Sequence, residues 1–197
     1  VMGHKKGAEA LRGTITACGE LGIKYLSVYA FSTENWNRPE AEVKFLMNLI
    51  RTLTEKEVPE LKQKGARVRV IGNKSQLSKD LQESIQKMEE ETAENTKIQV
   101  NLMINYGSRD EIIHAVQGLV SDHEKSPFDI TEEKLASYLY TKDIPDPDVF
   151  IRTSGECRIS NFLLWQLSYS ELFFIDTLWP DFKKENLVDV LRDFQQR

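Results

Sequence analysis

The sequence predicts an α/β fold in which a mainly parallel central sheet is flanked by helices. Short apolar runs typical of strands alternate along the 197-residue chain with longer segments of helical spacing. Such alternation favours parallel strands joined by crossover helices. The 40% hydrophobic content suits one domain with a sizeable core, and the chain is short for two. We therefore expect residues 1–197 to form a single domain.

In the first half of the chain, glycine and proline mark where helices end. Gly22 stops the opening helical pattern, and Gly65 is placed to end the long helical pattern that begins at Glu40. Pro59 should bend or interrupt that helix, because it lacks a backbone N–H. The expected elements are a helix over 4–21, a buried strand over 25–31, a helix over 40–64 and a strand over 68–71.

In the second half, Ser78 and Thr131 are placed to begin helices, since their side-chain oxygens can cap free N–H groups. Pro145 and Pro147 separate the second of these helices from the last predicted strand. The expected elements are a helix over 78–95, a strand over 98–105, a helix over 109–120, a polar connection over 121–129, a helix opening at 131, a strand over 149–151 and a helix over 183–196.

Composition excludes several classes of function. The net charge of −5 argues against nucleic acid binding, which needs a basic surface. Cys18 and Cys157 are too far apart in sequence for a disulfide framework or a zinc motif, and they fit a reducing cytosol. We find no signal peptide and no apolar run of membrane-spanning length, so we expect a cytoplasmic protein.

Segment 152–160 has the composition of an anion clamp. It holds two arginines, two serines and a glycine directly after the apolar run 149–151. Arginine presents a planar fork of donors that matches phosphate oxygens, serine adds hydroxyl donors, and glycine lets a ligand approach the backbone. A surface loop with two solvated arginines is the alternative.

The predicted topology favours the clamp. Ligands of open α/β sheets bind beyond the carboxyl ends of the strands. Four segments should meet at that edge: 32–38, 72–73, 105–109 and 152–160. All except 72–73 carry arginine beside small polar residues.

Other candidates have two interpretations each. Trp36 would cover a reacting centre or anchor its loop, and anchoring is favoured. His4, at the start of a helix, suits a diphosphate but is equally consistent with a solvated histidine. Glu171 would share a magnesium ion with diphosphate oxygens or orient an arginine. Cys157 lacks the arginine six residues later that cysteine phosphatases use, because Leu163 stands there.

Several motifs together resemble those of cis-prenyltransferases, and of bacterial undecaprenyl diphosphate synthases (isoprenyl transferases) in particular. The resemblance covers essentially the whole chain in order, and its longest motif, from Arg152 to Glu171, is highly specific. The motifs are Gly3-His4, Phe31-Ser-Thr-Glu-Asn-Trp-Asn-Arg-Pro39, Asn105-Tyr-Gly-Ser-Arg109, Arg152-Thr-Ser-Gly-Glu-x-Arg-Ile-Ser-Asn-Phe-Leu-Leu-Trp-Gln166, Tyr169-Ser-Glu171 and Leu178-Trp-Pro-Asp-Phe182.

The resemblance implies an activity and a set of partners. Such enzymes condense isopentenyl diphosphate repeatedly onto farnesyl diphosphate with Mg²⁺, forming cis double bonds. The product is the lipid carrier for cell-wall sugars. The family fold is a homodimer with an apolar tunnel for the growing chain, and product release implies peripheral membrane contact.

The resemblance also assigns roles to residues. Isopentenyl diphosphate would be held by Arg152, Arg158 and Ser160. The loop near the reacting ends would supply Ser32, Thr33, Glu34, Trp36 and Arg38, with Asn35 and His4 as catalytic residues and His4 also close to the allylic diphosphate. Glu171 would serve the metal. The apolar pattern of the helix that begins at Glu40, taken alone, favours ordinary burial between the sheet and a neighbouring helix. The resemblance shifts this interpretation toward a tunnel lined by Phe45, Leu46, Leu49 and Ile50.

Two family motifs do not occur between Val1 and Arg197. One is the N-terminal Asp-Gly-Asn-Gly-Arg-Trp motif, whose aspartate carries magnesium, and the other is an Arg-x-x-Gly-Gly-like tail. We expect both to lie outside this sequence. A non-catalytic scaffold subunit of a prenyltransferase complex is the alternative. A phosphate-ester hydrolase is disfavoured, because the chain offers no nucleophile or metal-ligand cluster.

Overall fold

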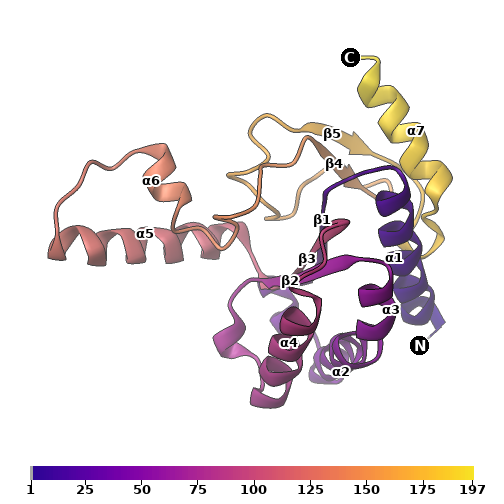
Figure 1. The fold of residues 1–197 in the computed structure, drawn as a ribbon, viewed down its shortest axis with the longest axis horizontal. Helices are drawn as coiled ribbons and strands as arrows, with labels where there is room; N and C mark the ends of the chain where they lie inside the picture. Colours follow the sequence, from indigo (N-terminus) through magenta and orange to yellow (C-terminus); the bar gives the residue numbers. More distant parts are fainter. Residues whose placement is uncertain (1) are drawn as a thin grey trace.

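Five parallel strands in two sheets form the centre of the molecule (Figure 1). The computed structural model describes residues 2–197, with side chains from Lys6 onward. One sheet has the strand order β1-β3-β2 and the other pairs β4 with β5. The strands are β1 (Tyr25–Ser32), β2 (Ala66–Ile71), β3 (Ile98–Tyr106), β4 (Val149–Arg152) and β5 (Glu171–Phe174). The predicted α/β class with parallel strands is confirmed.

Seven α-helices and three short 3₁₀ helices are found in the described residues. The α-helices are α1 (Met2–Glu20), α2 (Glu40–Lys56), α3 (Val58–Gln63), α4 (Lys79–Thr92), α5 (Ser108–Lys125), α6 (Glu132–Ala136) and α7 (Lys184–Gln195). The 3₁₀ helices are η1 (Thr33–Asn37), η2 (Lys74–Gln76) and η3 (Trp179–Asp181).

The core divides into two apolar clusters. The first joins β1, β2 and β3 to α1, α2, α3, α4 and α7, and it includes Ile50 and Leu81. Its central strand β3 is buried along almost its whole length, as expected for a strand with neighbours on both sides. The second cluster lies toward β4, and its buried members are Ile71, Met103, Tyr106, Phe150, Phe162, Leu163 and Leu167.

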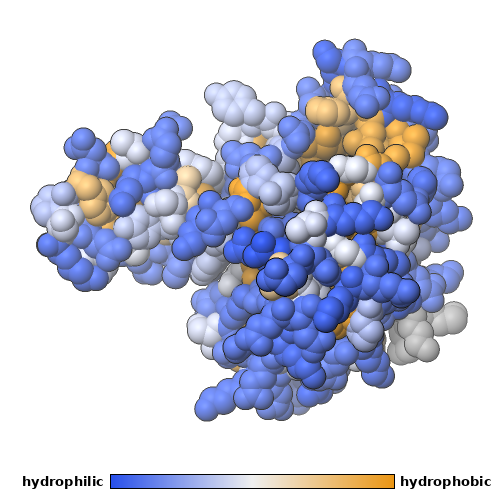
Figure 2. All heavy atoms as spheres, viewed as in Figure 1, coloured by the Kyte–Doolittle hydropathy of each residue, from blue (hydrophilic) through white to orange (hydrophobic). Residues whose placement is uncertain are grey.

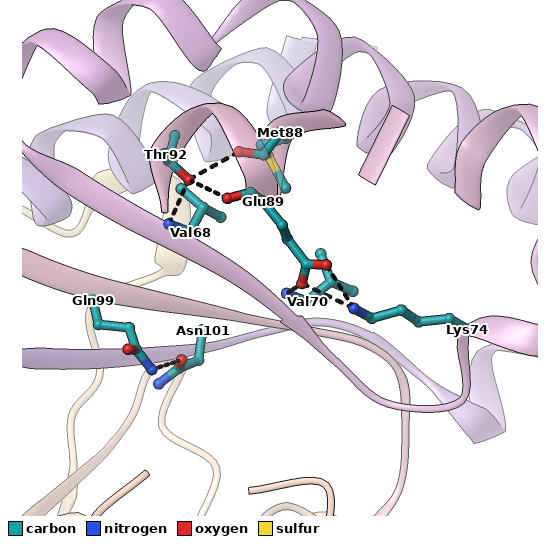
Figure 3. A network of polar contacts seen from close by, with 8 residues as sticks. All are labelled: Val68, Val70, Lys74, Met88, Glu89, Thr92, Gln99 and Asn101. Atoms are coloured by element: carbon teal, nitrogen blue, oxygen red, sulfur yellow. Dashed lines mark hydrogen bonds and ion pairs between the residues drawn. The ribbon is translucent and has the colours of Figure 1, made fainter. Parts of the chain in front are cut away.

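Side chains from α4 and the turn after it satisfy backbone groups of β2, an edge strand of its sheet (Figure 3). Thr92 Oγ1 accepts a hydrogen bond from the Val68 N–H at 3.0 Å, and Glu89 Oε1 accepts one from the Val70 N–H at 2.6 Å. Asn95 Nδ2 donates to the Ala66 carbonyl at 2.8 Å. Because these groups are paired, the β2 edge is protected against pairing with another chain.

The boundaries differ from the predicted ones at three places. The predicted helix over 40–64 is interrupted at Glu57, and Pro59 stands in the first turn of α3, which confirms the effect expected of the proline. Helix α5 continues to Lys125 through most of the predicted polar connection, supported by a Lys125–Asp122 ion pair at 3.1 Å. Strand β5 was not predicted, because its four residues are too few to show a periodic pattern.

Helices α5 and α6 extend away from the body as an arm (Figure 1). Residues Ile113, Val116 and Val120 form an exposed apolar stripe on α5. On β5, Leu172 and Phe174 are also exposed, and Figure 2 shows apolar residues gathered over the region of β4, β5 and α7. No helix in the described part of the chain is both long enough and apolar enough to cross a membrane.

Candidate functional site

An open cleft of about 480 Å³ lies where the carboxyl end of β1 meets the start of α5 and the segment after β4. The prediction that segments 32–38, 105–109 and 152–160 come together is therefore confirmed. The residues that line the cleft are Tyr29, Phe31, Ser32, Glu34, Asn35, Arg109, Ser160 and Asn161.

The fourth predicted segment has a structural role. The Asn73 N–H donates to the Asn105 carbonyl at 3.1 Å, which places this turn at the same edge of the sheet. Gly72 has a φ of +134°, and a Cβ there would lie 2.2 Å from the Ile104 carbonyl oxygen, so only glycine fits. Neither Gly72 nor Asn73 lines the cleft.

The arginine segment folds back on itself. Arg152 Nη1 donates to Ser160 Oγ at 3.0 Å. The backbone is left-handed at Ser154 (φ +74°) within this loop and at Ser160 (φ +49°) and Asn161 (φ +60°) at its end, an unusual conformation for residues other than glycine. Arg158 pairs with Glu156 and its side chain is 63% exposed, so an incoming anion can compete for it. Neither arginine is among the residues that line the cleft, and their role in holding a phosphate group stays a prediction.

Asn161 connects the arginine segment to the other two. Its carbonyl accepts from the Ser108 N–H, and its Oδ1 accepts from the Arg109 N–H, both at 2.9 Å. Its Nδ2 donates to Glu34 Oε1 at 2.7 Å. One side chain therefore spans the start of α5 and the loop after β1.

The loop after β1 is held by its own polar groups. Asn35 Oδ1 accepts from the Ser32 N–H at 3.0 Å. The Trp36 indole N–H donates to Asn105 Oδ1 at 2.7 Å, and its ring meets Phe31 edge-on at 5.1 Å. These contacts favour the anchoring role of Trp36 over a covering role. Arg38 lies 3.5 Å from Glu42 and is mostly exposed.

Glu34 is the acidic residue among the described residues that line the cleft. Burial favours its neutral form, but hydrogen bonds from Asn161, from its own backbone N–H and from Ser32 and Thr33 outweigh that effect. The pKa of Glu34 is therefore lowered, and the carboxylate stays charged at neutral pH.

A buried polar network lies beneath the cleft. Glu111 is fully buried, and its Oε2 accepts from the Tyr106 hydroxyl at 2.5 Å and from Gln166 Nε2 at 3.1 Å. Burial raises the pKa of Glu111 despite these hydrogen bonds. Tyr29, which lines the cleft, donates to the Tyr106 carbonyl at 3.0 Å and stacks on Phe162. The floor of the cleft is therefore tied to the second core cluster.

Ser32, Glu34, Asn35 and Ser160 line the cleft, whereas Thr33, Trp36, Arg38, Arg152 and Arg158 belong to the same segments but are not among its lining residues. The remaining predicted residues are His4, the four on α2 and Glu171. His4 belongs to α1, but its side chain lies outside the described side chains. The start of α1 is on the carboxyl side of the sheets, since the Trp179 indole N–H, just after β5, donates to the Gly7 carbonyl at 3.2 Å. On α2, Ile50 is buried and Leu46 packs on the first cluster, whereas Leu49 is half-buried and Phe45 exposed. Their role in a tunnel stays a prediction.

Glu171 is at the amino end of β5, whereas Arg152 is at the carboxyl end of the paired strand β4. It accepts from Arg197 Nη1 at 2.7 Å. No cluster of three or more histidine, cysteine or acidic residues suited to a metal occurs in the described part of the chain. Both Glu34 oxygens already accept hydrogen bonds, from Asn161 and Thr33. The metal role of Glu171 stays a prediction.

Sequence reasoning assigned no individual role to four residues of the cleft lining: Tyr29, Phe31, Arg109 and Asn161. Tyr29 lies inside a strand, where an aromatic residue is normally interpreted as part of the hydrophobic core. Asn161 follows the arginine segment, and its only local signal is the tolerance of asparagine for left-handed backbone.

Comparisons with known proteins give a consistent result. The family model described as "Putative undecaprenyl diphosphate synthase" matches residues 1–197. An isoprenyl transferase of Clostridium tetani is 47% identical over 199 residues, covering 100% of this chain and 78% of that protein. Another, from Fusobacterium nucleatum, is 48% identical, covering 100% of this chain and 84% of that protein.

Two solved structures share the fold. The crystal structure of "a probable undecaprenyl diphosphate synthase" from Campylobacter jejuni superposes with a TM-score of 0.89 at 34% identity, covering 98% of this chain and 90% of that one. Lavandulyl diphosphate synthase from Lavandula x intermedia, solved with dimethylallyl diphosphate, superposes with a TM-score of 0.93 at 34% identity, covering 98% and 85%.

Proposed function

Because this chain belongs to the undecaprenyl diphosphate synthase family of cis-prenyltransferases, we propose that it condenses isopentenyl diphosphate with farnesyl diphosphate in repeated steps. The product would be a long-chain polyprenyl diphosphate, the precursor of a lipid carrier for cell-wall synthesis. The observation that carries the proposal is that Arg109 and Ser160 line the same open cleft, where Ser160 also accepts a hydrogen bond from Arg152. Two diphosphates bring several negative charges, and such donors bind them.

In the proposed site, Arg152, Arg158 and Ser160 hold isopentenyl diphosphate. The loop over Ser32–Arg38, with Asn35 toward the reacting ends, faces the allylic substrate, and His4 contacts its diphosphate. Fixed hydrogen-bond donors suit this work, because they stabilise charge without reorganising during the reaction.

The bond between C1 of the allylic substrate and a diphosphate oxygen breaks, and the electron pair leaves with the diphosphate. The double bond of isopentenyl diphosphate attacks C1, and the adduct loses a proton to form the new double bond. We propose a diphosphate oxygen as the proton acceptor. Mg²⁺ bound to the diphosphate would add positive charge to the leaving group.

The growing chain would extend past α2, along Phe45, Leu46, Leu49 and Ile50. We propose a homodimer as the working form. The exposed stripe of Ile113, Val116 and Val120 and the exposed Leu172 and Phe174 supply apolar surface for it. Sedimentation velocity across a range of protein concentrations tests the dimer, and a monomer at micromolar concentration would contradict it.

The function is tested by incorporation of labelled isopentenyl diphosphate onto farnesyl diphosphate. The full-length gene product is compared with residues 1–197, each with Mg²⁺ and with EDTA. Magnesium-dependent incorporation by the full-length protein, with chain length read by chromatography, is expected. No incorporation by either protein would overturn the proposal and favour a non-catalytic scaffold subunit.

A further inference from the structure

Asn161 uses all of its side-chain polar groups within the site. Its Oδ1 accepts from the Arg109 N–H and its Nδ2 donates to Glu34 Oε1, a residue 127 positions away in sequence. The amide orientation is settled by its partners, because an N–H must face an acceptor and a carboxylate accepts only. The neighbouring residue is Ser160, which receives the Arg152 hydrogen bond.

The surroundings of Asn161 leave it little room to move. A Cβ on Gly107 would lie 2.8 Å from Asn161 Nδ2 and 2.4 Å from Thr33 Oγ1. The loop after β1, the end of β3 and the arginine segment are therefore in close contact at one point. The left-handed backbone of Asn161 suits asparagine better than most other residues.

We infer that Asn161 is a positioning residue, which holds the Arg152–Ser160 pair at a fixed distance from the Glu34 loop and Arg109. This inference rests on the proposed function, since the two sides of the cleft would each face one diphosphate. Asn161 acts through its neighbours. A change in its hydrogen bonds shifts the spacing between the two anion-binding sides, and shifts of about 1 Å can cost about 100-fold in rate.

The test exploits the polarity of the Asn161–Glu34 hydrogen bond. Asn161→Asp keeps an acceptor for the Arg109 N–H but places a second carboxylate against Glu34. In the double variant with Glu34→Gln, the amide of residue 34 donates to the carboxylate of residue 161, so the same bond forms with its direction reversed. Asn48→Asp, at an exposed position of α2, is the matched control.

Two measurements are made on the full-length protein. Titration calorimetry gives the affinity for inorganic diphosphate, and steady-state kinetics give KM and kcat for isopentenyl diphosphate. Asn161→Asp should weaken diphosphate binding and raise KM by about 10- to 100-fold. The same change made in the Glu34→Gln background should have an effect of less than about threefold. Asn48→Asp should match wild type.

Equal effects of Asn161→Asp in both backgrounds would overturn the inference, because they would show no coupling between residues 34 and 161. Unchanged affinity in a folded Asn161→Asp protein would also overturn it. Wild type that binds diphosphate but does not incorporate isopentenyl diphosphate would refute the proposed function only, and coupling in diphosphate affinity would still support the inference. Wild type that binds no diphosphate would overturn both.

Discussion

At the scale of single residues, the cleft depends on side chains held by specific partners. Arg152 is fixed by Ser160, and Asn161 joins Arg109 to Glu34. Arg158 is different, since it pairs with the nearby Glu156 and most of its side chain faces solvent. A residue of this kind is available for a ligand.

Replacing Arg158 with alanine should weaken the binding of isopentenyl diphosphate. Loss of one charge-assisted hydrogen bond costs about 1.5–3 kcal/mol, which corresponds to about a 10- to 100-fold rise in KM. Steady-state kinetics on the full-length enzyme measure this rise in KM. Arg192→Ala on α7 is the control, because Arg192 is similarly exposed beside Asp189. Kinetics equal to wild type would show that Arg158 does not contact the substrate.

Gly107→Ala should destabilise the protein. The new Cβ would overlap with Thr33 Oγ1 and Asn161 Nδ2, and overpacking of this kind costs about 1–3 kcal/mol. Gly13→Ala is the matched control, since no atom lies within 4 Å of its Cβ position inside α1. That change should stabilise the protein by about 0.5–1 kcal/mol. Urea unfolding measures both, and a neutral Gly107→Ala would contradict the close packing.

At the scale of elements, α4 stabilises the edge of the larger sheet as well as covering it. The buried apolar face of α4 includes Leu81, Ile85 and Met88. Thr92 adds a specific contact, since its hydroxyl accepts from the Val68 N–H and donates to the Met88 carbonyl at 2.9 Å (Figure 3).

Thr92→Val should lower the free energy of unfolding by about 1–3 kcal/mol. Valine has nearly the same shape but leaves the buried Val68 N–H without its acceptor. Thr52→Val is the control, because the Thr52 hydroxyl donates to Asn48 in the same helical pattern but is exposed. Denaturant melts compare the two variants, and equal losses would show that the edge contact contributes nothing. Activity per folded molecule should match wild type in both.

At the scale of the whole molecule, a buried carboxyl group lies beside the second core cluster, under the site. Glu111 joins the start of α5 to Tyr106 at the end of β3 and to Gln166 beyond the arginine segment. Gln166 Oε1 is buried without a hydrogen-bond partner in the described part of the chain. Such a polar core holds its elements in one arrangement at some cost in stability.

The pH dependence of stability should reveal Glu111. Its pKa is raised in the folded state, so the folded protein binds more protons than the unfolded chain between about pH 4.3 and the folded pKa. Stability therefore falls as pH rises through that window. Because Glu111→Gln removes this contribution, the unfolding free energy of the variant minus that of wild type should increase with pH across the window.

Urea unfolding from pH 4 upward measures this difference. Glu133→Gln is the control, since hydrogen bonds from its own backbone N–H and from Thr131 lower the pKa of Glu133. The contribution of Glu133 is present above its unfolded pKa and is lost as pH falls through its folded pKa. The difference for Glu133→Gln should therefore decrease as pH rises, and the same sign for both variants would refute the assignment.

The sequence by itself determined the kinds of elements and most of their positions. Hydrophobic periodicity, the stops at Gly22 and Gly65 and the interruption near Pro59 are local properties, and the structure agrees with them. The cluster of arginines and serines in 152–160 is also local, and so are the motifs that identify the family.

Only the tertiary structure decided how these elements meet. It separated β4 and β5 from the three-stranded sheet, and it placed Glu171 at the end of β5 opposite the arginine segment. It also brought Asn161 to Glu34, across 127 residues. Such contacts depend on the packing of whole elements, because no local preference of asparagine or glutamate specifies a partner so distant in the chain.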